Sequence, residues 1–323
     1  MKNPIEQTLQ HKARTIAASA VVLLLTLTFT VFGPEAFAAG KAGDELLVKV
    51  SAEQAEKVTF PSEDGDVTGG APTMLDGYLF RPAGPGPFPA VVGMHGCGGL
   101  FTAGRINARY ADWGERLAAL GYVVLLPDSF TSRGIREVCT KKDRSGFSAH
   151  RERRRDADGA LHWLQTQGMV QGDRVGLMGW SNGGSTVLAT IGPPTKKEKN
   201  NDFRVAIAFY PGCTSFVKKE NWRPRLPLTI FIGEVDDWTP AAPCKELVAR
   251  ATAQGCQADI VTFPNAYHGF DHPNLPLKTR KGLAYTVGGE GTAKIGTDPE
   301  GRAAVLESVP KLLERYLGRS GKE

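Results

Sequence analysis

The sequence predicts a doubly wound α/β fold, a mostly parallel sheet with helices on both faces in a single domain. Two observations favour this class. Six short runs rich in Val, Ile and Leu are continuously apolar, as expected for strands that are buried on both sides. Longer stretches with helical apolar spacing separate most of these runs, which is the alternation that a parallel sheet requires.

The strands are predicted in chain order from their composition and length. Thr73–Arg81 alternates apolar and polar residues after a Gly-Gly turn, so we expect an antiparallel edge strand there. The six buried strands are predicted at Ala90–His95, Tyr122–Pro127, Arg174–Gly179, Val205–Tyr210, Leu228–Gly233 and Ala258–Phe263.

Helices are predicted between the strands from apolar spacing and end signals. Thr239 is expected to cap one helix, with Pro240 at its first position. Pro310 predicts either a kink or a fresh start within the last helix. The predicted helices are Asn107–Leu120, Arg153–Gly168, one that begins at Asn182, Ala241–Gln254 and Arg302–Leu317.

Three segments are predicted to be loops, namely Ser129–His150, Gly192–Asp202 and Asp271–Pro299. The last is long and rich in glycine, which makes it a candidate lid or wrapping segment. The conformations of the first and last loops decide which substrates fit, and they do not follow from the sequence.

The N-terminal segment has the pattern of an export signal. Basic residues precede an apolar run from Thr15 to Phe32, and Ala36 and Ala38 have the spacing of a cleavage site. We therefore expect 1–38 to be a signal peptide that directs the chain to the periplasm or out of the cell. The alternative is an uncleaved N-terminal membrane anchor, because the apolar run is just long enough to span a bilayer.

The remainder is expected to comprise an N-terminal extension with an edge strand at 39–72 and the α/β domain at 73–323. The chain of 323 residues has 39 Lys+Arg, 34 Asp+Glu and 41% hydrophobic residues, which excludes collagen-like and wholly disordered proteins. A net charge of +5 is too small to favour a nucleic-acid partner. No other stretch approaches membrane-spanning length, so we expect no stable membrane association after cleavage.

The strongest motif is Gly-Trp-Ser-Asn-Gly at 179–183, which follows a predicted strand and precedes a predicted helix. This is the context of a nucleophile elbow, where a strained turn lifts a serine hydroxyl above the sheet. The helix N-terminus also directs a partial positive charge at the reacting centre. The motif therefore predicts that Ser181 is a nucleophile.

A serine hydroxyl needs a base to remove its proton and an acid to orient that base. His268 follows the last buried strand, where the order Ser, Asp, His along the chain places the base, and His272 is a nearby rival. Asp236 follows the preceding strand and is our choice of acid, with Asp237 left as a capping or supporting residue.

The reaction also needs N–H donors for the oxyanion. The glycine-rich sequence at 95–99 ends a strand, so we expect the backbone N–H groups of Cys97 and Asn182 to be these donors. The glycines lack the spacing of a phosphate-binding or dinucleotide-binding loop, and no Cys or His pair has metal-ligand spacing. We therefore expect neither a metal nor an organic cofactor.

With these motifs assembled, the chain resembles the dienelactone hydrolase family of the α/β-hydrolase superfamily over about Leu75 to Leu317. The segments that carry the resemblance are LDGYLFRP, HGCGG, GWSNGG, GEVDDWTP and AYHGFD. In the family pattern a proline stands four residues after the acid, which favours Asp236 over Asp237. The namesake enzymes use a cysteine nucleophile where this chain has Ser181, so the resemblance implies an esterase-type member.

The resemblance implies hydrolysis of a small carboxylic ester or lactone through an acyl-enzyme intermediate. It also suggests that Ser129, Phe130 and Arg133 lie near the mouth of the site, with Arg133 a candidate for binding a substrate carboxylate. Further candidate substrate contacts flank the motifs at Trp180, Trp238 and Phe270. The alternatives are a peptidase of the same superfamily and a non-catalytic cell-envelope binding protein with this fold.

The five cysteines are expected to pair in part, because an exported protein meets an oxidising compartment. We expect Cys97–Cys139 or Cys213–Cys244 to form, with Cys256 left unpaired. Cys244 and Cys256 flank a helix about 18 Å long, which is too far to bridge. The basic residues at 151–155 are interpreted as a solvated helix face with local ion pairs, and only secondarily as charge that steers an anionic substrate.

Overall fold

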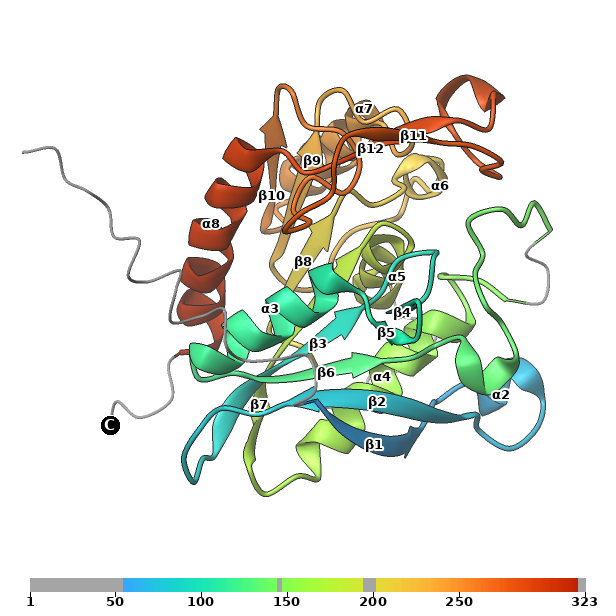
Figure 1. Cartoon of the computed structure of the whole chain (residues 1–323). Helices are drawn as coiled ribbons and strands as arrows, with labels where there is room; N and C mark the ends of the chain where they lie inside the picture. The colour runs from blue at the N-terminus through green and yellow to red at the C-terminus, as the bar shows by residue number, and fades with distance from the viewer. Residues whose placement is uncertain (1–54, 144–146, 194–201, 319–323) are drawn as a thin grey trace, which may run out of the picture. The chain divides into compact units, whose positions relative to one another are not determined.

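The computed structural model describes residues 55–143, 147–193 and 202–318 (Figure 1). The predicted signal peptide, residues 39–54 of the predicted N-terminal extension, residues 144–146 of the predicted loop at 129–150 and part of the loop after α5 lie outside the described residues. The helices are α2 (Gly65–Thr68), α3 (Ala108–Ala119), α4 (Glu152–Gln165), α5 (Asn182–Ile191), α6 (Thr214–Val217), α7 (Ala241–Ala253) and α8 (Pro299–Leu317). The strands are β1 (Glu56–Pro61), β2 (Met74–Phe80), β3 (Phe88–Met94), β4 (Phe101–Thr102), β5 (Arg105–Ile106), β6 (Val123–Pro127), β7 (Val170–Trp180), β8 (Val205–Phe209), β9 (Leu228–Gly233), β10 (Ala258–Phe263), β11 (Lys278–Arg280) and β12 (Ala293–Ile295).

Eight strands form one sheet in the order β1-β2-β6-β3-β7-β8-β9-β10. Neighbouring strands from β6 to β10 are parallel, and β1, β2 and β6 pair in antiparallel fashion. Strands β3, β6, β8 and β9 are buried at every position. Their continuous apolar character follows from this burial, since both faces of the sheet are covered. The predicted fold class is confirmed.

The strand predicted at Thr73–Arg81 is antiparallel, but the prediction that it lies at the edge is wrong. It forms β2, and β1 pairs along its outer side with Val58 opposite Gly77. Alternation of apolar and polar residues indicates that one face of the strand is partly exposed. It does not indicate whether another strand pairs along its outer side. Strand β1 lies within the predicted extension and is itself the edge strand of the sheet. It shows only weak alternation and is mostly exposed, apart from Phe60, so its sequence does not indicate its bounds.

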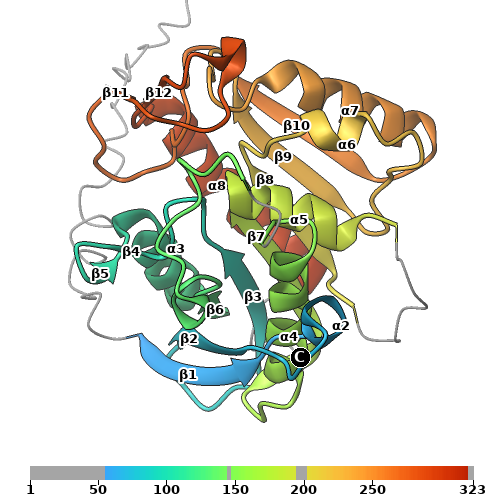
Figure 2. The same cartoon turned by 90° about the vertical axis from the view of Figure 1, so that its right-hand side faces the viewer.

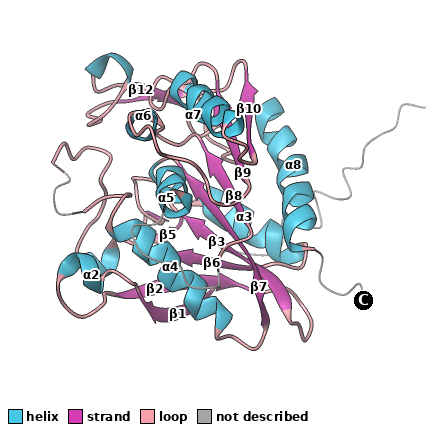
Figure 3. Ribbon diagram, turned by 180° about the vertical axis from the view of Figure 1, so that it is seen from behind, coloured by secondary structure: helices cyan, strands magenta, loops and turns pink. Residues whose placement is uncertain are grey.

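Helices cover both faces of the sheet. Figure 2 shows α3 on one side of the central strands and α4 and α5 on the other. Figure 3 looks onto the face covered by α4, α5 and α7. On the opposite face, α8 is joined to α3 by an ion pair of 2.7 Å between Arg302 and Asp112. The two covered layers are the doubly wound arrangement that the sequence predicts.

Two predicted helix ends differ from those observed. Helix α7 begins at Ala241 behind Pro240, and the Thr239 side chain donates no capping hydrogen bond because it turns toward the loops after β8 and β9. Helix α8 is continuous through Pro310, so the predicted fresh start is wrong. A proline inside a helix removes one backbone hydrogen bond, and the buried residues along the face of α8 hold the helix on both sides of it.

The long segment predicted as a loop at Asp271–Pro299 contains a short hairpin, in which β11 pairs with β12. The hairpin is attached to two other parts of the chain. The N–H of Ala284 donates to the carbonyl of Cys139, and Ile295 forms a bridge with His268. Across the described residues, no helix combines the length and apolar character that crossing a membrane requires.

Candidate active site

Ser181 lies at the sharp turn between β7 and α5, with φ of 55° and ψ of −115°. Its N–H donates to the carbonyl of Phe209 at 2.9 Å, which ties the turn to β8. A Cβ atom at Gly179 would lie 2.4 Å from the Gly183 oxygen, and one at Gly183 would lie 1.9 Å from the Met94 oxygen. Side chains are therefore excluded at both positions, and the predicted elbow is the observed local structure.

The structure brings the three predicted catalytic residues together. His268 Nε2 lies 2.9 Å from Ser181 Oγ, and His268 Nδ1 lies 2.8 Å from Asp236 Oδ2. Asp236 follows β9 and His268 follows β10, so two adjacent parallel strands deliver both to the same edge of the sheet. The three side chains belong to residues only 8%, 4% and 5% exposed for Ser181, Asp236 and His268. This burial excludes most water from the hydrogen bonds that join them.

The loop after β9 holds the Asp236 carboxylate. The N–H groups of Trp238 and Thr239 donate to Oδ1 at 2.9 Å and 2.8 Å. The Thr239 hydroxyl lies 3.0 Å from Asp236 Oδ2 and 3.1 Å from His268 Nδ1. The two N–H groups hold Oδ1, so Oδ2 is turned toward the Thr239 hydroxyl and accepts the imidazole N–H, which orients the ring.

The rival residues are committed elsewhere. Asp237 Oδ1 accepts the N–H of Lys294 at 2.9 Å and so holds the hairpin strand β12. His272 Nδ1 accepts the N–H of Asn274 at 3.2 Å. Burial, followed by the charge of Arg109, lowers the pKa of His272 to about 4.

The expected oxyanion donors lie at the ends of β3 and β7. The N–H of Gly96 donates to the Tyr110 hydroxyl at 2.8 Å, and the carbonyl of Cys97 accepts the N–H of Val138 at 2.8 Å. A disulfide joins Cys97 to Cys139. Asn182 is the first residue of α5, so its N–H lies at the helix N-terminus beside Ser181.

Arg153 joins the end of β3 to the start of α5. The prediction that the basic residues at 151–155 form a solvated helix face is therefore wrong for Arg153. Its residue is 0% exposed. Nη1 donates to Asn182 Oδ1 at 2.6 Å and Nη2 donates to the His95 carbonyl at 2.7 Å. Burial lowers the pKa of Arg153 to about 10, against the opposing charge of Asp156, so the guanidinium stays cationic at neutral pH. The sequence offers no signal for this role, because three further arginines stand beside it.

His95 is a buried neutral imidazole directly after β3. Burial, followed by the charge of Arg153, lowers its pKa well below the usual value. Nε2 accepts the N–H of Ser129 at 3.2 Å, so Nδ1 carries the proton and donates to the Gly96 carbonyl at 2.8 Å. The ring therefore ties the strand end to the loop after β6.

Ser181 and His268 open into a cavity of about 410 Å³. The charged side chains among its described lining residues, Arg109, Lys278 and Arg280, are all cationic, and sequence reasoning identified none of them. The lining residues are Gly96, Cys97, Gly98, Gly99, Thr102, Asn107, Arg109, Tyr110, Ser181, Trp238, His268, Gly269, His272, Leu275, Lys278, Arg280 and Ile295. Within the described part of the chain, no cluster of three or more His, Cys, Asp or Glu residues is arranged to hold a metal ion.

Of the four predicted substrate contacts, Trp238 lines this cavity, with its ring 4.6 Å from that of His268. The other three are used in the interior. Arg133 donates to Asp64 and Asp156 at 2.7 Å each, so its guanidinium is not available to a substrate carboxylate. Trp180 and Phe270 are buried beneath the site. Both residues stand next to a predicted catalytic residue in the sequence. Neighbouring residues of an extended segment point in opposite directions, so a residue beside the site in the sequence can face the interior.

A buried carboxylate connects the floor of the cavity to the core. Asp271 accepts hydrogen bonds from the Trp113 and Trp180 indoles and from the Tyr210 hydroxyl. Its Oδ1 also lies 3.2 Å from Arg109 Nε, which holds that cation at the cavity wall. These partners come from three separate segments of the sequence, α3, the end of β7 and the residue after β8, so no local pattern could have indicated the cluster.

The structure contains both cysteine pairs that the sequence offered as alternatives. Cys97–Cys139 and Cys213–Cys244 have Cα separations of 4.9 Å and 5.1 Å, and Cys256 is free. The first disulfide fastens the loop after β3 to the segment after β6. The second fastens the loop after β8 to α7, behind the acid.

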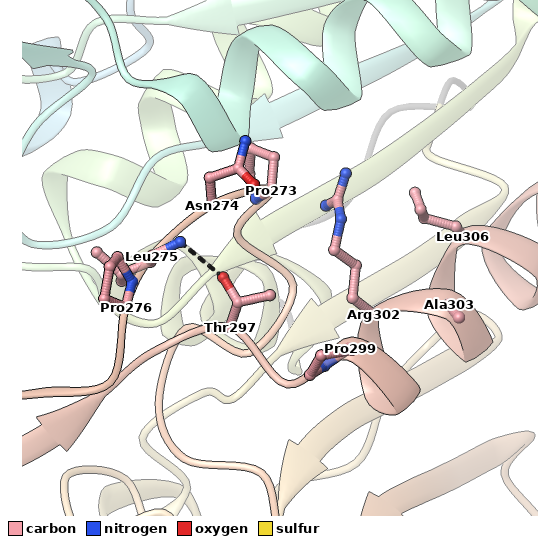
Figure 4. A pocket seen from close by; sticks show the side chains of 9 residues that line it. All are labelled: Pro273, Asn274, Leu275, Pro276, Thr297, Pro299, Arg302, Ala303 and Leu306. Atoms are coloured by element: carbon pink, nitrogen blue, oxygen red, sulfur yellow. Dashed lines mark hydrogen bonds between the residues drawn. The ribbon is translucent and has the colours of Figure 1, made fainter. Parts of the chain in front are cut away.

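A second hollow of about 530 Å³ lies beside the segment at 273–276 (Figure 4). The Leu275 N–H donates to Thr297 Oγ1 at 2.8 Å across it, and Leu275 also lines the catalytic cavity. Arg302 lines the hollow, and its guanidinium is bound to Asp112 and to the Asp271 carbonyl. The described residues that line the hollow include no nucleophile paired with a base.

The sheet order, the elbow and the acid and histidine after successive parallel strands define a protein of the α/β-hydrolase fold. Solved structures of that fold superpose on the chain. The "Putative Dienelactone Hydrolase" from Klebsiella pneumoniae matches with a TM-score of 0.57 at 17% identity, covering 81% of this chain and 100% of that one. Esterase 2 of Thermogutta terrifontis matches with a TM-score of 0.57 at 18% identity, covering 84% and 98%.

The chain belongs to the dienelactone hydrolase family, whose sequence profile matches residues 75–316. The "Putative carboxymethylenebutenolidase" of Synechocystis sp. is 26% identical over 208 residues, which are 61% of this chain and 81% of that protein. The "Probable 2-oxo-3-(5-oxofuran-2-ylidene)propanoate lactonase" of Bradyrhizobium sp. is 25% identical over 213 residues, which are 60% and 77%. The protein is a carboxylic ester hydrolase.

Proposed function

We propose that this protein is a serine esterase that cleaves a small ester or lactone through an acyl-enzyme on Ser181. One observation carries the proposal. A continuous line of hydrogen bonds runs from Ser181 Oγ through His268 to Asp236, and it begins at a strained serine that faces a cavity. A nucleophile, a base and an orienting acid in this arrangement are what acyl transfer requires.

In the first half of the reaction, Ser181 Oγ attacks the substrate carbonyl carbon while His268 Nε2 takes its proton. Asp236 accepts the Nδ1–H of the ring and stabilises the imidazolium that forms. The backbone N–H groups of Cys97 and Asn182 donate to the developing oxyanion. The C–O bond then breaks, and the leaving alkoxide takes the proton from His268 Nε2.

In the second half, His268 removes a proton from water as the water oxygen attacks the acyl carbon. The bond to Ser181 Oγ breaks, and the proton returns to that oxygen. An ester and water thus give an acid and an alcohol, and no redox step is involved. With a lactone, the freed hydroxyl stays attached to the acyl chain until the product leaves.

The cavity supports a small substrate with an anionic group. Its volume of about 410 Å³ suits a small molecule, and none of its described lining residues is a carboxylate. Lys278 and Arg280 line it with no ion pair among the described residues, whereas Arg109 is paired with the buried Asp271. Opposite charge favours binding of an anion in a partly enclosed site. One curated relative is named a lactonase, which supports a lactone as the first substrate class to assay.

The test is to compare wild type with Ser181→Ala on short-chain aryl esters and small lactones. We expect kcat to fall about 10⁴-fold or more, because no other group supplies the nucleophile. Ser185→Ala is the matched control, since Ser185 lies in the same helix and accepts only the Gly212 N–H at 3.0 Å. A fluorophosphonate probe should label wild type and Ser185→Ala but not Ser181→Ala. Equal activity of Ser181→Ala and wild type would end the proposal.

We further propose that the protein acts outside the cytoplasm after loss of 1–38. Two disulfides support this location, because such bonds persist in oxidising compartments. Intact-mass measurement of the protein recovered from a bacterial periplasm should give a chain beginning at Ala39. A full-length chain held in the membrane fraction would favour the anchor instead.

A further inference from the structure

Arg153 is a fully buried cation that the reaction described above does not use. Its residue is 0% exposed, and it lies in the first turn of α4, far along the chain from both segments that carry the expected oxyanion donors. Burying a charge is costly unless its hydrogen bonds are well satisfied. The groups that the guanidinium contacts therefore decide whether its burial is tolerated.

The two terminal nitrogens of Arg153 contact the two halves of the expected oxyanion hole. Nη2 donates at 2.7 Å to the carbonyl of His95, two residues before Cys97. Nη1 donates at 2.6 Å to the side chain of Asn182, whose backbone N–H is the other expected donor. A guanidinium is planar and rigid, so the two acceptors are held at a set separation.

The charge of Arg153 is not neutralised by a direct ion pair. Asp156, one turn further along α4, accepts hydrogen bonds from Arg133 and Ser62. Among the described residues, no carboxylate lies within ion-pair distance of Arg153, and its terminal nitrogens donate to a carbonyl and an amide oxygen. The positive charge thus lies behind the loop and the helix start where negative charge develops in the reaction.

We propose that Arg153 is a positioning residue that sets the separation of the Cys97 and Asn182 N–H groups and adds a fixed positive charge behind them. The inference rests on the proposed serine mechanism. It predicts that loss of the guanidinium weakens transition-state stabilisation while substrate binding changes little, because neither nitrogen lines the cavity.

The first test compares Arg153→Met and Arg153→Lys with wild type on one aryl ester. We expect kcat to fall about 10-fold to 100-fold in both, because lysine keeps the charge but cannot bridge both acceptors. KM should stay within about twofold of wild type, as for an interaction made in the transition state. Arg151→Gln is the control, since that exposed arginine pairs only with Glu152 beside it, and it should keep wild-type kcat.

The second test is chemical rescue of a variant that lacks the side chain, and it remains informative if Arg153→Met and Arg153→Lys fold poorly. Arg153→Gly leaves a space the size of the lost side chain, and guanidinium ion added at low concentration should restore part of kcat. Urea at the same concentration is the matched neutral additive and should not. Circular dichroism before and after addition reports whether the folded fraction changes.

Several outcomes would overturn the proposal. These are a wild-type kcat in folded Arg153→Met, a loss that follows the folded fraction alone, or no guanidinium rescue in a folded Arg153→Gly. Labelling of Ser181 separates this failure from that of the mechanism itself. If the probe labels Ser181 in the wild type and the folded Arg153 variants keep wild-type kcat, only the positioning role is refuted. If Ser181→Ala is active, the serine mechanism is refuted and this inference with it.

Discussion

The two sides of the catalytic cavity are held in different ways. On the acid–base side, the Asp236 carboxylate is fixed largely by its own loop, through the N–H groups of Trp238 and Thr239. On the oxyanion side, the loop at Cys97 is held by residues far away in the sequence, Arg153 and Cys139. One side is built from local turns and the other from long-range contacts.

This difference predicts how each side responds to substitution. Damage to the acid–base side removes a group to which the proposed mechanism assigns a step, so its effect is expected to be large. Damage to the distant supports of the oxyanion side shifts donors that remain present, so its effect is graded. Kinetic and stability measurements on matched variants can confirm or refute this difference between the two sides of the cavity.

The largest effect is expected from Asp236→Asn. An amide at this position favours the wrong imidazole tautomer, so kcat should fall about 10⁴-fold with little change in Tm. Asp237→Asn is the control, because Asp237 holds the hairpin through the Lys294 N–H and does not contact His268. Steady-state kinetics decide the matter, and a larger loss in Asp237→Asn would mean that the acid has been misassigned.

A smaller effect is expected from removing the disulfide on the oxyanion side. Cys97→Ser with Cys139→Ser should lower kcat about 10-fold, because the loop that carries one donor loses its tether. Cys213→Ser with Cys244→Ser removes a loop closure of similar length and should cost a similar stability, about 2–4 kcal/mol. Thermal unfolding and kinetics on both pairs separate the two effects. Equal kcat in the two double variants would contradict a special role for the first disulfide.

A local support on the acid–base side should have a still smaller effect. Thr239→Val removes the hydroxyl beside Asp236 and His268, and a net hydrogen-bond contribution of about 1 kcal/mol corresponds to about a fivefold loss of kcat. Thr239→Ser keeps the hydroxyl and should restore kcat. If both variants lose activity equally, packing by the threonine methyl group matters instead.

The smallest effect is expected from His272→Gln on the pH profile. Burial and the charge of Arg109 lower the pKa of His272 to about 4, so the ring is neutral above about pH 5 in the free enzyme. It neither gains nor loses a proton in the usual assay range, and the acid limb of kcat/KM should be unchanged. A displaced acid limb in His272→Gln would show that this ring, and not only His268, titrates during turnover.

The core of the fold was predictable because burial on both faces forces a strand to be apolar throughout. The antiparallel flank was harder, since alternation in β2 reveals one partly exposed face but not the neighbour β1. The candidate site shows the same division. The elbow and the acid and histidine loops each carry a short pattern, whereas Arg109 and Arg153 stand among ordinary arginines in the sequence.

By itself the sequence determined the fold class, the family, and which serine, acid and histidine to place at the ends of three strands. It could do so because these features depend on short-range periodicity and on turns whose geometry demands particular residues. Only the tertiary structure decided that Arg153 is buried behind the oxyanion loop, that Arg133 is held by Asp64 and Asp156, and which cations line the cavity. Those facts depend on contacts between segments far apart in the chain, and such contacts leave no local pattern to read.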